Sequence, residues 1–298
     1  MKLILVRQTG YIFVRSKVVM ISLERMVDKV KSFKTLNHIG IKLTRMIAAN
    51  EGQSAEYEKI IKYDPALVMR VFKLVNSAFF SLREKVETVS DAVTYIGLDN
   101  LRNMVVVEAV KDLFKEGHEE EIFSRKKLWS HCVATGVCAQ MISEKVLGVN
   151  GEDAFLCGLL HDIGIMIEDQ LDTELFLSML KSYDGKMSFT EHEKKHIGVD
   201  HCEAGFWLSR DWKLPASVQF GIRDHHLNSS RIKPDSITGV IQLSELLVTK
   251  LDYSAVPEMH HDLPRPLLLH MRENIKEYKT VIQELPEEMK KAKDIYAL

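Results

Sequence analysis

Apolar residues recur every three or four positions along most of this chain. Leu23, Met26 and Val30 form one such stripe, and Leu43 and Ile47 belong to the next. This spacing is typical of one face of an α-helix, whereas strand-like runs are confined to residues 3–6 and 11–14. The sequence therefore predicts an all-α fold. The expected helices cover residues 57–63, 66–75, 101–114, 127–146, 153–171, 189–207 with an interruption near 198, 215–225 and 237–251, and a last charged helix begins near 267.

The chain divides most naturally into four parts. Residues 1–20 form an N-terminal extension, for which a small hairpin and a segment lying on the domain are both open interpretations. Residues 21–118 and 119–252 form two helical parts, and 253–298 form a helical tail after several prolines. A chain of 298 residues accommodates one large domain or two coupled subdomains.

Composition narrows the class of protein. The net charge of −2 argues against nucleic acid as a partner, because such binding depends on a basic surface. The four cysteines form no C-x-x-C pair, which indicates reduced core residues in a cytoplasmic protein. No apolar run approaches the roughly 20 residues that cross a membrane, so we expect no membrane association.

The strongest chemical signal is the adjacent pair His161-Asp162, set between apolar Leu159-Leu160 and Gly164. Adjacent residues on a helix lie about 100° apart, so both side chains can face one pocket. Imidazole and carboxylate together suit Zn, Fe or Mn. One such pair recurs by chance and is weak evidence alone.

Further candidate ligands surround this pair in the sequence. Each has an ordinary explanation: His131 could be a satisfied core histidine, His201 could bridge helices, the pair His225-His226 could be a solvated helix end, and Glu245 could face solvent. Glu245, however, stands in an otherwise apolar stretch, where a charge needs a partner or a metal. The predicted site for one or two divalent ions comprises His131, His161, Asp162, His201, His225, His226 and Glu245.

The order of these residues resembles the HD superfamily of metal-dependent phosphohydrolases, and the chain resembles most closely its HDOD (HD-related output domain) branch over about residues 33–251. That resemblance implies an HD-like multi-helix bundle with an N-terminal helical subdomain, acting in bacterial signal transduction. The further motifs that carry it are Tyr63-Asp-Pro-Ala-Leu67, Leu74-Val-Asn-Ser-Ala-Phe-Phe80, Ala92-Val-Thr-Tyr-Ile-Gly97, Gly198-Val-Asp-His-Cys-Glu-Ala-Gly205, Trp212-Lys-Leu-Pro215 and Ile222-Arg-Asp-His-His226.

The chain also departs from the related HD-GYP phosphodiesterases. Where they carry a lysine after the HD-x-Gly turn, Ile165 stands here, and an apolar side chain cannot bind a phosphate. The GYP signature is missing, and Glu245 replaces the terminal aspartate. Lys127 occupies the position of an additional carboxylate, which argues against a third metal.

Three functions fit these observations. The favoured one is a regulatory module with little or no catalysis, whose expected partners are signalling proteins that bind grooves near Asn76–Phe80. The second is a phosphohydrolase acting on a nucleotide or cyclic dinucleotide. Two divalent ions among neutral histidines and two carboxylates would leave a site near +2, which attracts a phosphate anion and lowers the pKa of a bridging water. The third is a scaffold with vestigial histidines.

Overall fold

The computed structural model describes residues 38–49, 51–76, 86–114, 122–256 and 263–296. Every regular element in these ranges is helical, which confirms the all-α prediction. The strand-like runs near the N-terminus and the stripe from Leu23 to Val30 lie outside the described residues. The elements are α2 (His38–Ala48), α3 (Ser54–Ile61), α4 (Pro65–Val75), α5 (Val89–Ile96), α6 (Leu98–Val110), η1 (Lys111–Phe114), α7 (Arg125–Met141), η2 (Ile142–Val146), α8 (Glu152–Leu160), α9 (Ile163–Leu171), α10 (Thr173–Ser182), α11 (Phe189–His196), α12 (His201–Asp211), α13 (Ala216–Asp224), α14 (Ile237–Lys250), α15 (Arg265–Glu273) and α16 (Ile275–Tyr296).

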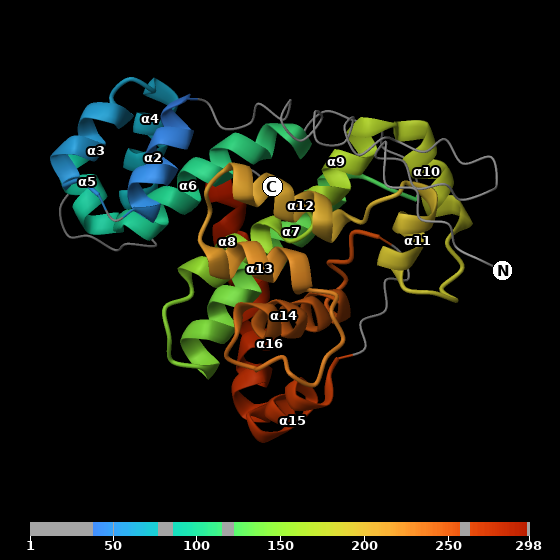
Figure 1. Cartoon of the computed structure of the whole chain (residues 1–298). Coiled ribbons are helices and arrows are strands. Elements are labelled where there is room, and N and C mark those ends of the chain that lie inside the picture. The colour runs from blue at the N-terminus through green and yellow to red at the C-terminus, as the bar shows by residue number, and fades with distance from the viewer. Residues whose placement is uncertain (1–37, 50, 77–85, 115–121, 257–262, 297–298) are drawn as a thin grey trace.

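The first four described helices form a small group at one end of the molecule (Figure 1). Helix α5 packs on α3 and α4, and α6 packs on α2, α4 and α5. Helix α6 also contacts α8, so it connects this group to the larger bundle. Asn103 on α6 donates to the backbone carbonyl of Glu152 at 2.9 Å, and Arg102 pairs with Asp153 at 2.6 Å. These polar contacts fix α6 on the N-terminus of α8.

Helices α7 and α8 form the centre of the larger bundle, and two glycines let them approach closely. A Cβ atom on Gly158 would lie 2.7 Å from the Cα of Gly136, which is far below van der Waals contact. Small residues at both positions are therefore required for this crossing. The close crossing places His131 near the start of α7 beside His161 at the end of α8.

The predicted helix over residues 153–171 is wrong as a continuous element. It is divided into α8 and α9, and His161-Asp162 form the turn between them. The His161 ring bonds to the carbonyl of Gly158 at 2.7 Å, while the amide of Ile165 bonds to the carbonyl of Asp162 at 3.0 Å. The backbone bond from Ile165 to Asp162 spans three residues and replaces the four-residue spacing of the α-helix at this point.

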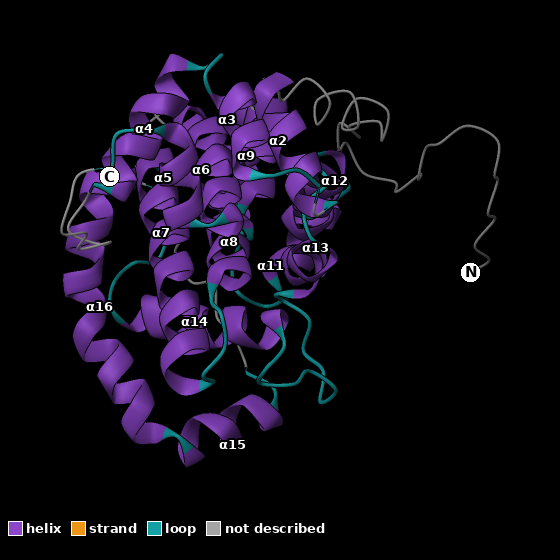
Figure 2. Ribbon diagram, turned by 90° about the vertical axis from the view of Figure 1, so that its left-hand side faces the viewer, coloured by secondary structure: helices purple, strands orange, loops and turns teal. Residues whose placement is uncertain are grey.

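Two other predictions of helices need correction, because one predicted helix is divided in two and one observed helix was not predicted. The last charged helix is two helices, α15 and α16, because Asn274 ends α15 with a side-chain bond to the carbonyl of His270. Helix α10 was not predicted, although Asp172 caps its N-terminus by accepting from the amide of Leu175. Helix α16 packs along α7 and η2, as Figure 2 shows on the outer side of the bundle.

None of the described helices is long and apolar enough to cross a membrane.

Candidate metal centre

The structure brings all seven predicted ligands to one place in the bundle. Six of the seven side chains are buried, and His226 is half-buried. They come from five segments that are far apart in the sequence. These are His131 on α7, His161 and Asp162 in the α8–α9 turn, His201 at the start of α12, His225 and His226 directly after α13, and Glu245 on α14.

The ligands fall into two half-sites. In the first half-site, the Nε2 atoms of His131 and His161 lie 3.3 Å apart. Oxygen Oε1 of Glu245 is 3.0 Å from the first nitrogen and 3.1 Å from the second. Oxygen Oδ2 of Asp162 is 3.5 and 3.2 Å from the same two nitrogens. Two nitrogens and two oxygens thus converge on one point from three segments.

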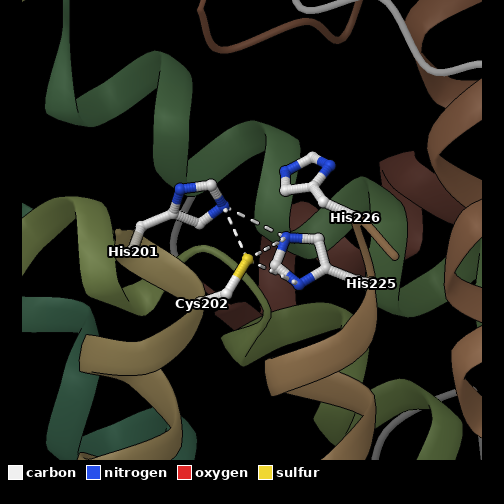
Figure 3. A group of neighbouring side chains, drawn as sticks. All are labelled: His201, Cys202, His225 and His226. Atoms are coloured by element: carbon white, nitrogen blue, oxygen red, sulfur yellow. Dashed lines mark hydrogen bonds between the residues drawn. The ribbon is translucent and has the colours of Figure 1, made fainter. Parts of the chain in front are cut away.

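The second half-site lies on the other side of Asp162. Figure 3 shows its His201, Cys202, His225 and His226. The Nε2 atoms of His201 and His225 are 3.2 Å apart, and each lies 3.5 Å from Oδ1 of Asp162. Cys202 Sγ is 3.5 Å from Nε2 of His201. The ring of His226 lies beside that of His225, with 4.2 Å between the centroids and a tilt of 44° between the planes. Each of His201, Cys202, His225 and His226 offers a potential ligand atom, and these atoms all lie within 4.8 Å of one another.

Asp162 joins the two half-sites. Its oxygens face opposite groups of histidines, and neither accepts a well-formed hydrogen bond within the part of the chain that the structure describes. The side chain is 1% exposed. A buried carboxylate without hydrogen bonds is costly, unless a cation lies against it. This orphaned carboxylate fits a bridging ligand between two ions.

The four buried histidines are oriented by the ring nitrogen that faces away from the centre. Nδ1 of His131 bonds to the carbonyl of Tyr253 at 2.8 Å, and Nδ1 of His161 to Gly158 at 2.7 Å. Nδ1 of His225 bonds likewise to Ile222 at 2.7 Å. A carbonyl only accepts, so Nδ1 carries the proton and Nε2 is the atom presented to the centre. Metal-binding histidines are held in this way in proteins.

His201 is oriented by a carboxylate, Glu193, which the sequence analysis did not include. Nδ1 of His201 lies 2.7 Å from Oε2 of Glu193, and the backbone amide of His201 donates to the same oxygen at 3.3 Å. Glu193 is fully buried, and Glu168 is buried beside it. Burial raises the pKa of both Glu168 and Glu193 well above their usual range, and for Glu168 the neighbouring Glu193 adds to this effect. The charged stretch around Glu193 gave no signal for this role.

When no metal ion is bound, the histidines of the first half-site have raised pKa values and bind protons more tightly. Burial disfavours the charged form of His131, but Glu245 and Asp162 outweigh it and raise the pKa to about 9. The same carboxylates raise the pKa of His161. Burial likewise opposes ionisation of Asp162, yet the histidines hold its pKa well below the usual range. Protons and a divalent cation therefore compete for the same Nε2 lone pairs.

The positions at which the sequence departs from the HD-GYP phosphodiesterases can be located in the structure. Ile165 is fully buried in the core, so it faces no substrate. Lys127 is exposed on α7. Glu245 is 1% exposed and accepts from Thr135 at 3.1 Å, so it does not face solvent. The donor set of imidazoles, carboxylates and one thiol suits Zn or Fe rather than Mg or Ca.

The chain belongs to the HDOD domain family, which matches residues 33–228. An uncharacterized protein from Treponema pallidum (strain Nichols) is 27% identical over 252 residues, which cover 83% of this chain. The chain spans only 47% of the length of that relative.

Solved structures share the fold. An HDOD domain protein of unknown function from Geobacter sulfurreducens has a TM-score of 0.65 at 22% identity, covering 93% of this chain and 97% of the other. A protein from Shewanella amazonensis SB2B whose name suggests a phosphohydrolase has a TM-score of 0.67 at 21% identity, covering 92% and 97%. A protein from Marinobacter aquaeolei VT8 whose name suggests signal transduction has a TM-score of 0.65 at 17% identity, covering 92% and 64%.

Proposed function

We propose that this protein is a regulatory HDOD module in signal transduction that holds one or two divalent metal ions and does not depend on turnover. The observation that carries the proposal is the position of Asp162. This buried carboxylate presents one oxygen to each half-site, and both oxygens lack well-formed hydrogen bonds from the described residues. His131, His161 and Glu245 would hold one ion, and His201 and His225 the other.

The surroundings of the centre argue against efficient hydrolysis. A phosphate ester needs a path to the ions and a cation to neutralise its charge. His131, His161, His201 and His225 are each at most 2% exposed. The family position that could supply a lysine is the buried Ile165. A metal held without substrate access can instead stabilise the bundle and report on metal supply.

A signalling role is supported by the family and by one structural neighbour. The family is that of HDOD domains, and the name of the Marinobacter aquaeolei neighbour suggests signal transduction. Occupancy of the centre would fix five segments relative to one another. A partner protein that contacts those segments could therefore distinguish the metal-bound form from the metal-free form.

The alternative function is metal-dependent phosphate ester hydrolysis. Two half-sites bridged by one carboxylate are typical of two-metal hydrolases, and the name of the Shewanella amazonensis neighbour suggests such an activity. When bound, a metal pair supplies a water of lowered pKa as nucleophile. In this chain, Asp162 would align the pair and the four histidines would fix its position.

Metal content and turnover separate these functions. The full chain is purified without a chelator or a histidine tag, and its Fe, Mn and Zn are measured together with those of His161→Ala. His270→Ala is the matched control, because His270 lies on α15 outside the centre. Each protein is then assayed with bis(p-nitrophenyl) phosphate and with cyclic dinucleotides.

The regulatory function is supported if the wild type and the control bind metal, His161→Ala does not, and no turnover is measured. Turnover that disappears in His161→Ala supports the hydrolase instead. A wild type that stays free of metal after reconstitution overturns both and leaves a scaffold with vestigial histidines.

A further inference from the structure

The second half-site contains a donor that the metal-site pattern did not include, the thiol of Cys202. This residue follows His201 in the first turn of α12 and is 4% exposed. The sulfur lies between the two buried histidines, 3.5 Å from Nε2 of His201 and 3.9 Å from Nε2 of His225. In Figure 3 the side chain points toward both rings. The sulfur is also 3.8 Å from Nδ1 of His225, so the thiol lies beside this ring and close to the point that both Nε2 atoms face.

The distances between these donors match a tetrahedral site. With Zn–N near 2.05 Å and Zn–S near 2.3 Å, tetrahedral angles give about 3.3 Å between nitrogens and about 3.6 Å between nitrogen and sulfur. The observed separations are 3.2 Å for His201 and His225, and 3.5 and 3.9 Å to the sulfur. A cysteine that only filled the core would need no such agreement.

Cys202 differs in this respect from another buried cysteine of the chain. Cys157 is also fully buried, but its sulfur donates to the carbonyl of Val218 at 3.7 Å. The nearest donors and acceptors of Cys202 are instead the ring nitrogens of His201 and His225. Only Cys202 joins a group of potential ligands among the described residues.

We propose that Cys202 is a thiolate ligand, which makes the second half-site a zinc site of two histidines, one cysteine and the bridging carboxylate. The ligands are His201, Cys202 and His225, with Oδ1 of Asp162, 3.5 Å from both histidine nitrogens, as the fourth donor. This inference rests on the proposed metal-holding function and specifies one of its two half-sites. Thiolate favours zinc over Mn or Mg, whereas the first half-site offers only nitrogen and oxygen.

A site with four protein donors has no position left for water. Closed sites of this kind are structural, and open ones with three protein ligands are catalytic. The second half-site would thus join the start of α12 to the end of α13 without contributing a nucleophile. The two half-sites of this centre would differ in metal preference, because only the second offers a sulfur donor.

X-ray absorption at the zinc edge tests the ligand directly. The full chain is loaded with zinc, and its spectrum is compared with those of Cys202→Ala and Cys202→Ser. Cys132→Ala is the matched control, because Cys132 is also buried and also follows a ligand histidine, His131. We expect a sulfur scatterer at about 2.3 Å in the wild type and control, absent from both Cys202 variants. Zinc affinity should fall in the variants by more than the roughly 10–100-fold typical of an outer-shell change.

The outcomes distinguish the thiolate ligand from the proposed metal-holding function. Bound zinc surrounded only by nitrogen and oxygen in the wild type overturns the thiolate ligand but leaves the metal centre. Sulfur that persists in the Cys202 variants, or disappears in Cys132→Ala, also overturns it. Failure to bind zinc while Fe or Mn is bound overturns the zinc site alone, and failure to bind any of the three metals overturns the metal centre itself. If the variants do not fold, the cobalt-loaded wild type decides, because thiolate ligation produces an intense sulfur-to-cobalt charge-transfer band and its absence refutes the proposal.

Discussion

Single residues of this centre illustrate which features a sequence reveals. The histidines and Asp162 could be predicted, because their types and order match a known family pattern and their chemistry suits a metal. Glu193 could not, since it lies in the charged stretch Glu191–Lys195 that has the composition of a solvated helix face. Its burial results from the packing of α11 on α12. Cys202 was interpreted as a core residue, and only its distance from two imidazoles distinguishes it.

Replacing Asp162 by asparagine should remove metal from both half-sites. The substitution keeps the size of the side chain but removes the carboxylate charge that both groups of histidines face. We expect metal affinity to fall by at least about 100-fold, since the loss of even an outer-shell partner costs 10–100-fold. Elemental analysis and calorimetric titration measure this. Asp211→Asn, on the exposed end of α12, should bind as the wild type does; unchanged binding by Asp162→Asn would exclude a bridging role.

Replacing Glu193 by glutamine should weaken the second half-site while the protein stays folded. Glutamine can still accept from Nδ1 of His201, but it no longer makes that imidazole more basic. The expected loss of metal affinity is about 10–100-fold, and the first half-site should keep its ion. Titration with two metal equivalents resolves the two steps. An equal loss at both steps would contradict an action through His201.

At the level of elements, long amphipathic helices were predicted well, but the interruptions within 153–171 and within the last charged helix were not. The break at His161-Asp162 has neither proline nor glycine at the turn itself, so local signals give no boundary. The break depends on tertiary packing: Gly164, at the start of α9, lies directly against the backbone of His201 on α12. A helix continued through 153–171 would not place this glycine there. The interruption near 198 was predicted. In the structure Gly198 lies there with a φ of +101°, a backbone conformation that favours glycine.

The contact between α9 and α12 should be intolerant of any added side-chain atom. A Cβ on Gly164 would stand 1.9 Å from the carbonyl oxygen of His201, and a backbone atom cannot rotate away. We expect Gly164→Ala to lower the free energy of unfolding by at least about 3 kcal/mol and to displace His201 from the centre. Urea unfolding and metal content test both effects. Gly205→Ala is the control, because its Cβ would meet the side chains of Ile222 and Ile163 at 3.0 and 3.3 Å and its nearest backbone atom only at 3.5 Å. A smaller loss for Gly164→Ala than for Gly205→Ala would show that the backbone contact is not the constraint.

For the whole molecule, the centre is where five segments meet at the interior of the larger bundle. Each of these segments contributes a ligand: α7, the α8–α9 turn, the start of α12, the residues directly after α13, and α14. The unfolded chain therefore has no site formed in advance. Binding free energy therefore adds to the stability of the bundle. The small N-terminal group of helices contributes no predicted ligand and contacts the larger bundle through α6. The division into parts at residue 118 remains a prediction from the sequence.

Removal of metal should make the stability of the protein depend on pH in a specific direction. In the metal-free form, the pKa of His131 is raised from 6.5 to about 9 by Glu245 and Asp162, which overcome the effect of burial. A raised pKa in the folded state stabilises fully below pH 6.5, and this contribution, at most about 3 kcal/mol, is lost as the pH rises through 9. Metal binding requires the deprotonated ring, so the stabilisation that metal provides should grow over the same interval. Urea unfolding from pH 6 to 9.5, with and without added zinc, measures the two curves. The curves should diverge as the pH rises, because protons leave the Nε2 atoms that the cation occupies. A metal-free protein whose stability rises between pH 6.5 and 9 would contradict this prediction. So would metal-bound and metal-free curves that converge as the pH rises, because protons and metal would then not compete for the same histidine nitrogens.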